Sequence, residues 1–169
     1  MVLIDDNYNQ AKSLMEYLTN NRELSMLSYI EPTLRKNFLL QCASFHEDEI
    51  MELLKEFATT HGQTEELVNF VKRFLIERQY DRLIDFKNNN INQFISLFGD
   101  NFKVLFLRDI SSIDSLSVGV SSFLELGRLR NLSIHGNLAN FNLDLTIDDI
   151  YRKHNEAMVF IQHLKTKLA

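Results

Sequence analysis

An arginine and a histidine in the segment FLELGRLRNLSIHGN, residues 123–137, could together act on a phosphate ester. The guanidinium of Arg130 is always charged, and its planar fork matches phosphate oxygens. The imidazole of His135 exchanges a proton near neutral pH, and the end of a helix dipole favours its charged form. RNA can be cleaved this way without a metal: the ribose 2′-hydroxyl attacks, the histidine moves the proton and the arginine stabilises the charge. DNA lacks that hydroxyl, so this chemistry predicts RNA and not DNA as the substrate.

The direction of these two side chains depends on how their helix ends. Five residues on a regular helix give a net rotation of about 140°, so Arg130 and His135 would point away from each other. Gly136 follows directly and is expected to end the helix in a left-handed turn, which leaves the direction of His135 least constrained. Asn131 lies four residues before His135 on the same face and could hydrogen-bond to its ring. On spacing alone, an alternative stays open: both residues are exposed and interact with the last carbonyl groups of the helix.

The hexapeptide RNLSIH at residues 130–135 resembles the Arg-Asn-x-x-x-His signature of the HEPN superfamily, the higher eukaryotes and prokaryotes nucleotide-binding domains. Its surroundings are similar as well, with an apolar Phe-Leu-Glu-Leu run before the motif, His-Gly-Asn at its end and one more amphipathic helix after it. The segments SFHEDEI at 44–50 and FISLFG at 94–99 resemble bacterial members, in particular those akin to the RiboL-PSP-HEPN group. The resemblance covers most of the chain, and the hexapeptide is its specific part.

This resemblance implies an all-α bundle that forms a homodimer, with the motif helices of both subunits at a shared cleft. It also implies a metal-independent endoribonuclease of a toxin–antitoxin or antiphage system, which would leave 2′,3′-cyclic phosphate ends and meet a cognate antitoxin or defence partner. Arg130 and His135 match the catalytic pair, and Asn131 matches the polar residue beside it. Glu47 is expected by analogy to face the cleft and to orient Arg130 or His135. Some HEPN proteins lack nuclease activity, so the alternative is a non-catalytic module that binds a partner protein or a nucleotide in an antitoxin or regulatory role.

Other charged residues allow two interpretations each. Arg128, together with Arg152 and Lys153 of a basic triplet at 152–154, could contact the RNA backbone, although a basic surface patch is the commoner meaning. The acidic run at 46–52 could hold a metal, but such runs more often form a solvated helix face. The chain has no glycine-rich phosphate loop, nucleophile elbow or dinucleotide fingerprint. We therefore predict no metal and no cofactor.

The composition indicates which elements position the motif. The 169 residues include only 5 Gly and 1 Pro, and this scarcity of turn residues argues against all-β and α/β folds. We predict a single all-α domain over 1–169, a bundle of about five to six helices. The single cysteine, Cys42, excludes an internal disulfide and favours a reducing cytoplasm. No apolar stretch approaches the length of a membrane span, and Asp5 and Asp6 do not fit a signal peptide. The net charge of −5 argues against non-specific coating of nucleic acid.

Hydrophobic periodicity and capping residues place the helices. A first helix is predicted from about Asp5 to Tyr29, and a second is predicted to begin at Pro32 because proline disfavours helix at the residue before it. Gly62 is expected to end the second helix in a left-handed conformation. Thr64 should begin a third helix, which fades into residues 87–90, and a shorter helix should cover 91–98.

The remaining elements surround the motif. Residues 104–107 form a short apolar run that could be a strand or a buried helix. A helix is predicted from Ser115 or Ser117 through Ile134, and Thr146 should cap the last helix. Gly119 and Gly127 are costly inside a helix. A close helix–helix approach, such as one across a dimer axis, would explain them, but so would chance.

Overall fold

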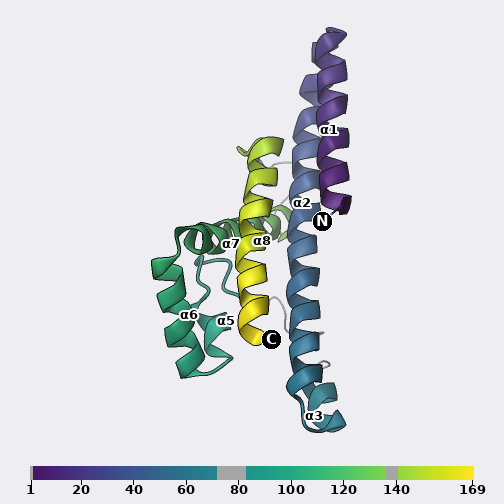
Figure 1. The fold of residues 1–169 in the computed structure, drawn as a ribbon. Coiled ribbons are helices and arrows are strands. Elements are labelled where there is room, and N and C mark those ends of the chain that lie inside the picture. Colours follow the sequence, from purple (N-terminus) through teal and green to yellow (C-terminus); the bar gives the residue numbers. More distant parts are fainter. Residues whose placement is uncertain (1, 72–82, 136–140) are drawn as a thin grey trace.

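The fold was analysed in a computed structural model, which describes residues 2–71, 83–135 and 141–169. The described residues form helices joined by short connections, with a single isolated bridge between Asp85 and Asn90 and no strand (Figure 1). The helices are α1 (Val2–Asn20), α2 (Leu24–His61), α3 (Glu65–Phe70), α5 (Asn92–Ser96), α6 (Asp100–Ser112), α7 (Asp114–His135) and α8 (Ile147–Leu168). The predicted all-α single domain is confirmed.

Helices α1, α7 and α8 pack around the long helix α2. Figure 1 shows α1 folded back along the first half of α2, while α8 runs beside α2 and α7 crosses behind α8. α6 and α5 lie on the side of α8 away from α2, and α3 lies at the far end of α2 (Figure 1). α7 packs most extensively on α8 and also contacts α2. The helix that carries the hexapeptide is therefore held by two other helices.

The first helix ends nine residues earlier than the sequence predicts. α1 ends at Asn20, where Arg22 adopts a left-handed conformation with φ of 61°. The N–H of Arg22 donates to the carbonyl of Thr19 at 3.1 Å, and the N–H of Glu23 donates to that of Leu18 at 2.9 Å, the paired bonds of a Schellman motif. Glycine normally occupies this left-handed position, so an arginine there gave no signal for the turn. The predicted helix to Tyr29 is wrong for this reason.

Pro32 lies inside α2 and does not begin it. A proline in a helix interior removes one backbone hydrogen bond and costs about 3 kcal/mol. The packing of α2 on α1 offsets this cost, because Phe38 and Leu39 are buried against Ile4. Tertiary contacts therefore carry the helix through a residue that would break it in isolation.

The core has two parts, and α7 contributes to both of them. The larger part joins α5, α6, α7 and α8, with Phe94, Phe106, Phe123 and Phe160 fully buried. The smaller part joins α1 and α2 to the start of α8 and contains Cys42, which is fully buried. Burial raises the pKa of the Cys42 thiol to about 12, so this side chain behaves as a small apolar residue.

Three other local predictions have different outcomes. α2 ends at His61 as predicted, but Gly62 is extended, with φ of −74°. A Cβ at Gly62 would collide with Ala58 and Val68, so space and not a left-handed φ requires glycine there. The apolar run 104–107 lies inside α6, which resolves the ambiguity in favour of helix. Thr146 caps α8 as predicted, since its hydroxyl accepts from the backbone N–H of Asp149 at 3.1 Å.

The two glycines of α7 lie at close contacts within this chain. A Cβ at Gly119 would lie 2.6 Å from the backbone oxygen of Glu156 and 3.1 Å from the backbone nitrogen of Phe160. A Cβ at Gly127 would overlap the ring of Phe86. Of the two explanations left open by the sequence, these contacts support close approach inside the chain. Gly119 in particular brings the backbone of α7 directly against α8.

Replacing Gly119 should therefore destabilise the protein. In an open helix, Gly→Ala stabilises by about 1 kcal/mol. Here the new Cβ meets backbone atoms that cannot rotate away, so Gly119→Ala is expected to lower the free energy of unfolding by about 1–3 kcal/mol. Urea unfolding followed by circular dichroism measures this change. Ser121→Ala, at an exposed position of the same helix, should leave stability within about 0.5 kcal/mol. A Gly119→Ala variant as stable as the Ser121→Ala control would contradict the close approach.

Candidate functional site

The hexapeptide lies at the C-terminal end of α7, where the helix passes from the core to the surface. The first part of α7 buries Leu116, Val120 and Phe123 at helical spacing, and Leu126 is fully buried one turn before the motif. Arg130 is only partly buried, with 22% of its side chain exposed. The fold therefore anchors the helix firmly and presents its last turns to solvent.

Glu47 and Asn131 both hold the guanidinium of Arg130. Its Nη2 donates to Oε2 of Glu47 on α2 at 3.2 Å, and its Nη1 donates to Oδ1 of Asn131 at 3.0 Å. The Glu47 side chain is 24% exposed, so the ion pair is partly shielded from water and stronger than a free surface pair. Because the guanidinium is rigid and planar, two bonds from different nitrogens fix its plane. The structure thus brings together Arg130, Asn131 and Glu47, three of the residues singled out from the sequence.

The structure adds one hydrogen bond near the end of α7 but does not describe the side chain of His135. The hydroxyl of Ser133, which is buried, donates to the backbone oxygen of Arg130 at 2.7 Å and occupies a carbonyl in the last turns of the helix. α7 ends at His135. The side chain of His135, and Gly136 with the rest of 136–140, lie outside the described residues. The left-handed turn at Gly136 and the contact between Asn131 and the His135 ring stay predictions.

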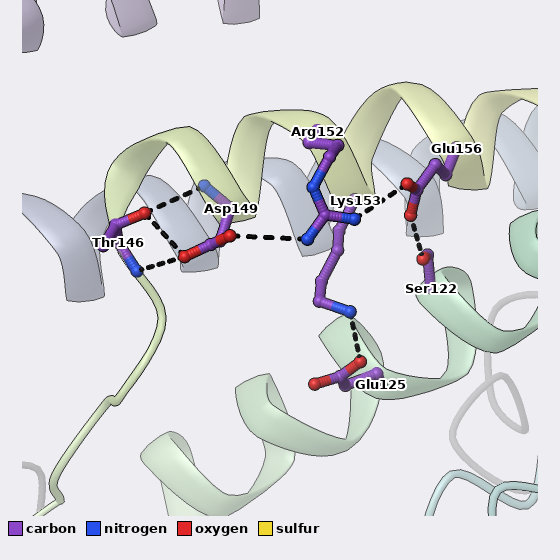
Figure 2. A network of polar contacts seen from close by, with 7 residues as sticks. All are labelled: Ser122, Glu125, Thr146, Asp149, Arg152, Lys153 and Glu156. Atoms are coloured by element: carbon purple, nitrogen blue, oxygen red, sulfur yellow. Dashed lines mark hydrogen bonds and ion pairs between the residues drawn. The ribbon is translucent and has the colours of Figure 1, made fainter.

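The basic residues expected to contact RNA lie in a network of ion pairs on α7 and α8 (Figure 2). Arg152 donates to Glu156 at 2.9 Å and to Asp149 at 3.3 Å. Lys153 donates to Oε2 of Glu125 on α7 at 2.6 Å, and only 15% of its side chain is exposed. Nearby carboxylates therefore neutralise both cations within the chain, and any contact with RNA would have to replace these partners.

Arg128 has a different position from those two cations. It is half-buried on α7, two residues before Arg130 and so about 160° away around the helix. A contact of Arg128 with RNA stays a prediction, as does a contact of Arg152 or Lys153.

Two buried histidines meet beside the motif, and the sequence interpretation missed both. Nε2 of His46 on α2 lies 2.9 Å from Nδ1 of His154 on α8, and the two ring planes are nearly parallel, with an interplanar angle of 3°. His46 is 2% exposed and His154 is fully buried, so the interpretation of 152–154 as a surface triplet is wrong for His154. The available signal was periodicity, because His154 continues the buried stripe Ile150, Ala157 and Ile161 of α8.

Both imidazoles are neutral at physiological pH. Burial, aided by the neighbouring His154, lowers the pKa of His46 to about 3, and burial lowers the pKa of His154 to about 4. A neutral pair can share one hydrogen bond, one ring donating and the other accepting, whereas two imidazolium rings would repel each other. The Nε2 of His154 has no partner among the described residues, so its lone pair or proton is buried without a hydrogen bond.

The described residues show neither a metal cluster nor a membrane span. Across 2–71, 83–135 and 141–169, no three His, Cys, Asp or Glu side chains are arranged to hold a metal ion. In the acidic run on α2, His46 points into the core and Glu52 pairs with Lys55 at 2.7 Å. Within the same ranges, no helix is long and apolar enough to cross a bilayer.

The histidine pair should make the protein sensitive to acid. Each histidine titrates near pH 6.5 in the unfolded chain but far lower in the folded protein. The unfolded state therefore binds more protons below pH 6.5, and the free energy of unfolding falls as the pH falls from 6.5 toward 4. From pH 7 to pH 5 the loss should be about 2 kcal/mol per histidine. Urea unfolding across this range measures it.

A variant without the two imidazoles provides the control for that titration. In His46→Gln/His154→Gln the amides can still hydrogen-bond to each other but do not titrate. Its stability at pH 7 is expected to be lower, while its change between pH 7 and pH 5 should be much smaller than in the wild type. An equally steep loss in both proteins would assign the acid sensitivity to other groups.

Comparison with known proteins bears on the family of this chain. Searches of curated proteins and of solved structures gave no match. A family model described as RiboL-PSP-HEPN matches residues 5–169, which is nearly the entire sequence. This match confirms the resemblance based on the hexapeptide and its surroundings. Members of this family are predicted ribonucleases. With its all-α fold and the Arg130-Asn131 motif at the end of a buried helix, the chain belongs to the RiboL-PSP-HEPN family.

Proposed function

We propose that this protein is a metal-independent endoribonuclease with Arg130, Asn131 and His135 at its active site. The observation that carries this proposal is the arrangement of Arg130: Glu47 and Asn131 hold its guanidinium, and its side chain is still 22% exposed. A cation that is fixed in direction but reachable from solvent suits the binding of a phosphodiester. Family membership supports the same chemistry.

The proposed reaction is an internal transesterification of RNA. The ribose 2′-oxygen forms a bond to phosphorus, the bond from phosphorus to the 5′-oxygen breaks, and a 2′,3′-cyclic phosphate remains. His135 removes the proton of the 2′-hydroxyl or supplies a proton to the departing 5′-oxygen. Arg130 stabilises the extra negative charge on the phosphorane, and Asn131 and Glu47 keep its guanidinium in place. No step requires a metal or a cofactor.

We further propose that the active unit is a homodimer with two copies of the motif around one cleft. Two large apolar side chains next to the motif support this arrangement, since Leu132 is 49% exposed and Ile134 is 51% exposed on the last turns of α7. Exposed apolar residues beside a candidate site favour a protein contact there. A dimer would also supply two histidines, one as base and the other as acid.

The biological role that fits this activity is that of a toxin or an antiphage effector. An RNase that needs no metal and no cofactor would damage cellular RNA unless a cognate antitoxin or defence partner controlled it. We place this activity in the reducing cytoplasm, which the single free thiol of Cys42 favours.

A non-catalytic HEPN module is the second candidate, and the ion pairs favour it. Arg130 is paired with Glu47, Arg152 with Asp149 and Glu156, and Lys153 with Glu125. These pairs reduce the positive potential available to RNA, in a chain of net charge −5. Such a module would bind a partner protein or a nucleotide and would not cut RNA.

Cleavage of RNA in EDTA tests the leading proposal. Wild-type protein should cut total cellular RNA in EDTA and leave 2′,3′-cyclic phosphate ends. RNA ligase can join these ends to a labelled adapter only after the phosphatase activity of T4 polynucleotide kinase has removed the phosphate. His135→Ala should lower the rate by about 10²–10⁴ because the proton transfer is lost. Arg130→Lys keeps the charge but loses the fork, and should lower the rate by about 10²–10³. Arg108→Lys, at an exposed position of α6, is the matched control and should cut normally. Intact RNA with the wild type, or full activity of His135→Ala, would refute the proposal.

Growth on expression separates the two candidates. A ribonuclease should arrest the growth of a bacterial host, and His135→Ala should relieve the arrest at equal protein levels. The non-catalytic module predicts normal growth with either protein. Arrest that persists in His135→Ala would indicate toxicity that does not come from cleavage at this site.

A further inference from the structure

On both α2 and α8, two consecutive residues contact two different helices. On α2, His46 meets His154 of α8 at 2.9 Å, while Glu47 reaches Arg130 of α7 at 3.2 Å. On α8, His154 meets His46, while Lys153 reaches Glu125 of α7 at 2.6 Å. Consecutive residues on a helix point about 100° apart, so one member of each pair faces the opposite helix and the other faces α7. The result is a polar triangle that links three helices at the level of the motif.

The two residues of α7 that are held in this way leave the helix on nearly opposite sides. Glu125 and Arg130 are five residues apart, which corresponds to about 140° of rotation. Glu47 pulls on one side with a negative charge and Lys153 on the other with a positive charge. Ion pairs on two sides of α7 therefore oppose rotation of this helix about its axis.

On this geometry we propose that Lys153 and Glu125 are positioning residues for Arg130 and do not contact RNA. Together with Glu47 and the His46–His154 hydrogen bond they form what we call the α7 clamp. The proposal rests on the proposed function, since it assigns how the phosphate-binding arginine is aimed. The Lys153 ammonium fits this role better than RNA binding, because its side chain is 15% exposed and is already 2.6 Å from a carboxylate (Figure 2).

Neighbouring contacts between α7 and α8 support the clamp. One helical turn before Glu125, the buried hydroxyl of Ser122 donates to Glu156 at 2.5 Å. Gly119, one turn earlier still, allows the backbone contact with α8. Glu125 is thus the last of three regularly spaced contacts between α7 and α8 before the motif, and the one best placed to set the angle of the final turns.

Kinetics on a charge-swapped pair tests the proposal. The substrate is a fluorescein-labelled single-stranded RNA of mixed sequence, and the buffer contains EDTA. Lys153→Met and Glu125→Gln should each lower kcat by roughly ten- to a hundredfold with KM unchanged, because a small displacement of a catalytic group has a large effect on rate. The two changes together should be no worse than either alone. Glu125→Lys/Lys153→Glu should recover most of the activity, since it restores an ion pair across the same helices.

A different set of kinetic changes is expected if Lys153 binds RNA and does not position Arg130. A lysine that binds RNA would give a raised KM in Lys153→Met, an unaffected or improved KM in Glu125→Gln, and no recovery in the swapped pair. Lys167→Met serves as the matched control for lost stability. Lys167 on α8 also makes an ion pair, at 2.8 Å to Asp109 of α6, but this pair lies far from the motif. This variant should keep its kcat. A decrease in kcat with Lys167→Met as large as that with Lys153→Met would also overturn the proposal.

A second measurement does not depend on catalysis. The ¹⁵N resonance of Arg130 Nε, assigned with Arg130→Lys, reports the surroundings of the guanidinium. It should shift in Lys153→Met, stay in place in Lys167→Met, and return toward the wild-type position in the swapped pair. An unchanged resonance in Lys153→Met would overturn the clamp. If the wild type cuts no RNA, the proposed function fails, and this resonance still decides whether the clamp positions Arg130.

Discussion

The close approach of two helix backbones at Gly119 is the constraint on which the rest of the site depends. A Cβ at this position would lie 2.6 Å from the backbone oxygen of Glu156. Because glycine has no Cβ, α7 can rest directly on α8. That contact lets short bonds such as Ser122 to Glu156 and Lys153 to Glu125 form further along the same pair of helices. The end of α7, with Arg130, then lies where Glu47 of α2 can reach it. A substitution far from the motif in sequence can therefore change the motif itself.

Whether the polar groups between these helices are neutral or charged depends on how deeply they are buried. Fully buried positions hold the neutral pair of His46 and His154, where a charge would cost several kcal/mol. Charged groups appear only where water still reaches them, as with Glu47 and Arg130 at 24% and 22% exposure. A charge at the centre would lose its hydration, whereas a charge at the edge keeps part of it and still finds a partner. The edge is also where a phosphate could enter.

The sequence predicts well those features that depend on local chemistry. Thr146 caps α8 as expected and forms a capping box with Asp149, and the hexapeptide with its surroundings pointed to the family that the comparison confirmed. Features that depend on distant contacts were missed. Pro32 continues a helix because α1 packs against it, and a left-handed Arg22 has no signature in composition. The contact between His46 and His154 joins residues 108 positions apart, which no local pattern reveals. Glu47 was named only by analogy, and its bond to Arg130 required the fold.

The burial of the single cysteine has a practical consequence for spectroscopy. Cys42 is fully buried and its thiolate is scarcely populated at neutral pH, since the pKa is about 12. The thiolate is the nucleophile that attacks maleimides and thiol-specific nitroxide reagents, so these reagents should leave this side chain unlabelled in the folded protein. A cysteine engineered at an exposed position of α7 and another on α2 could then be labelled selectively with the native residue left in place. The wild-type background is therefore already suitable for measuring distances between these helices in solution.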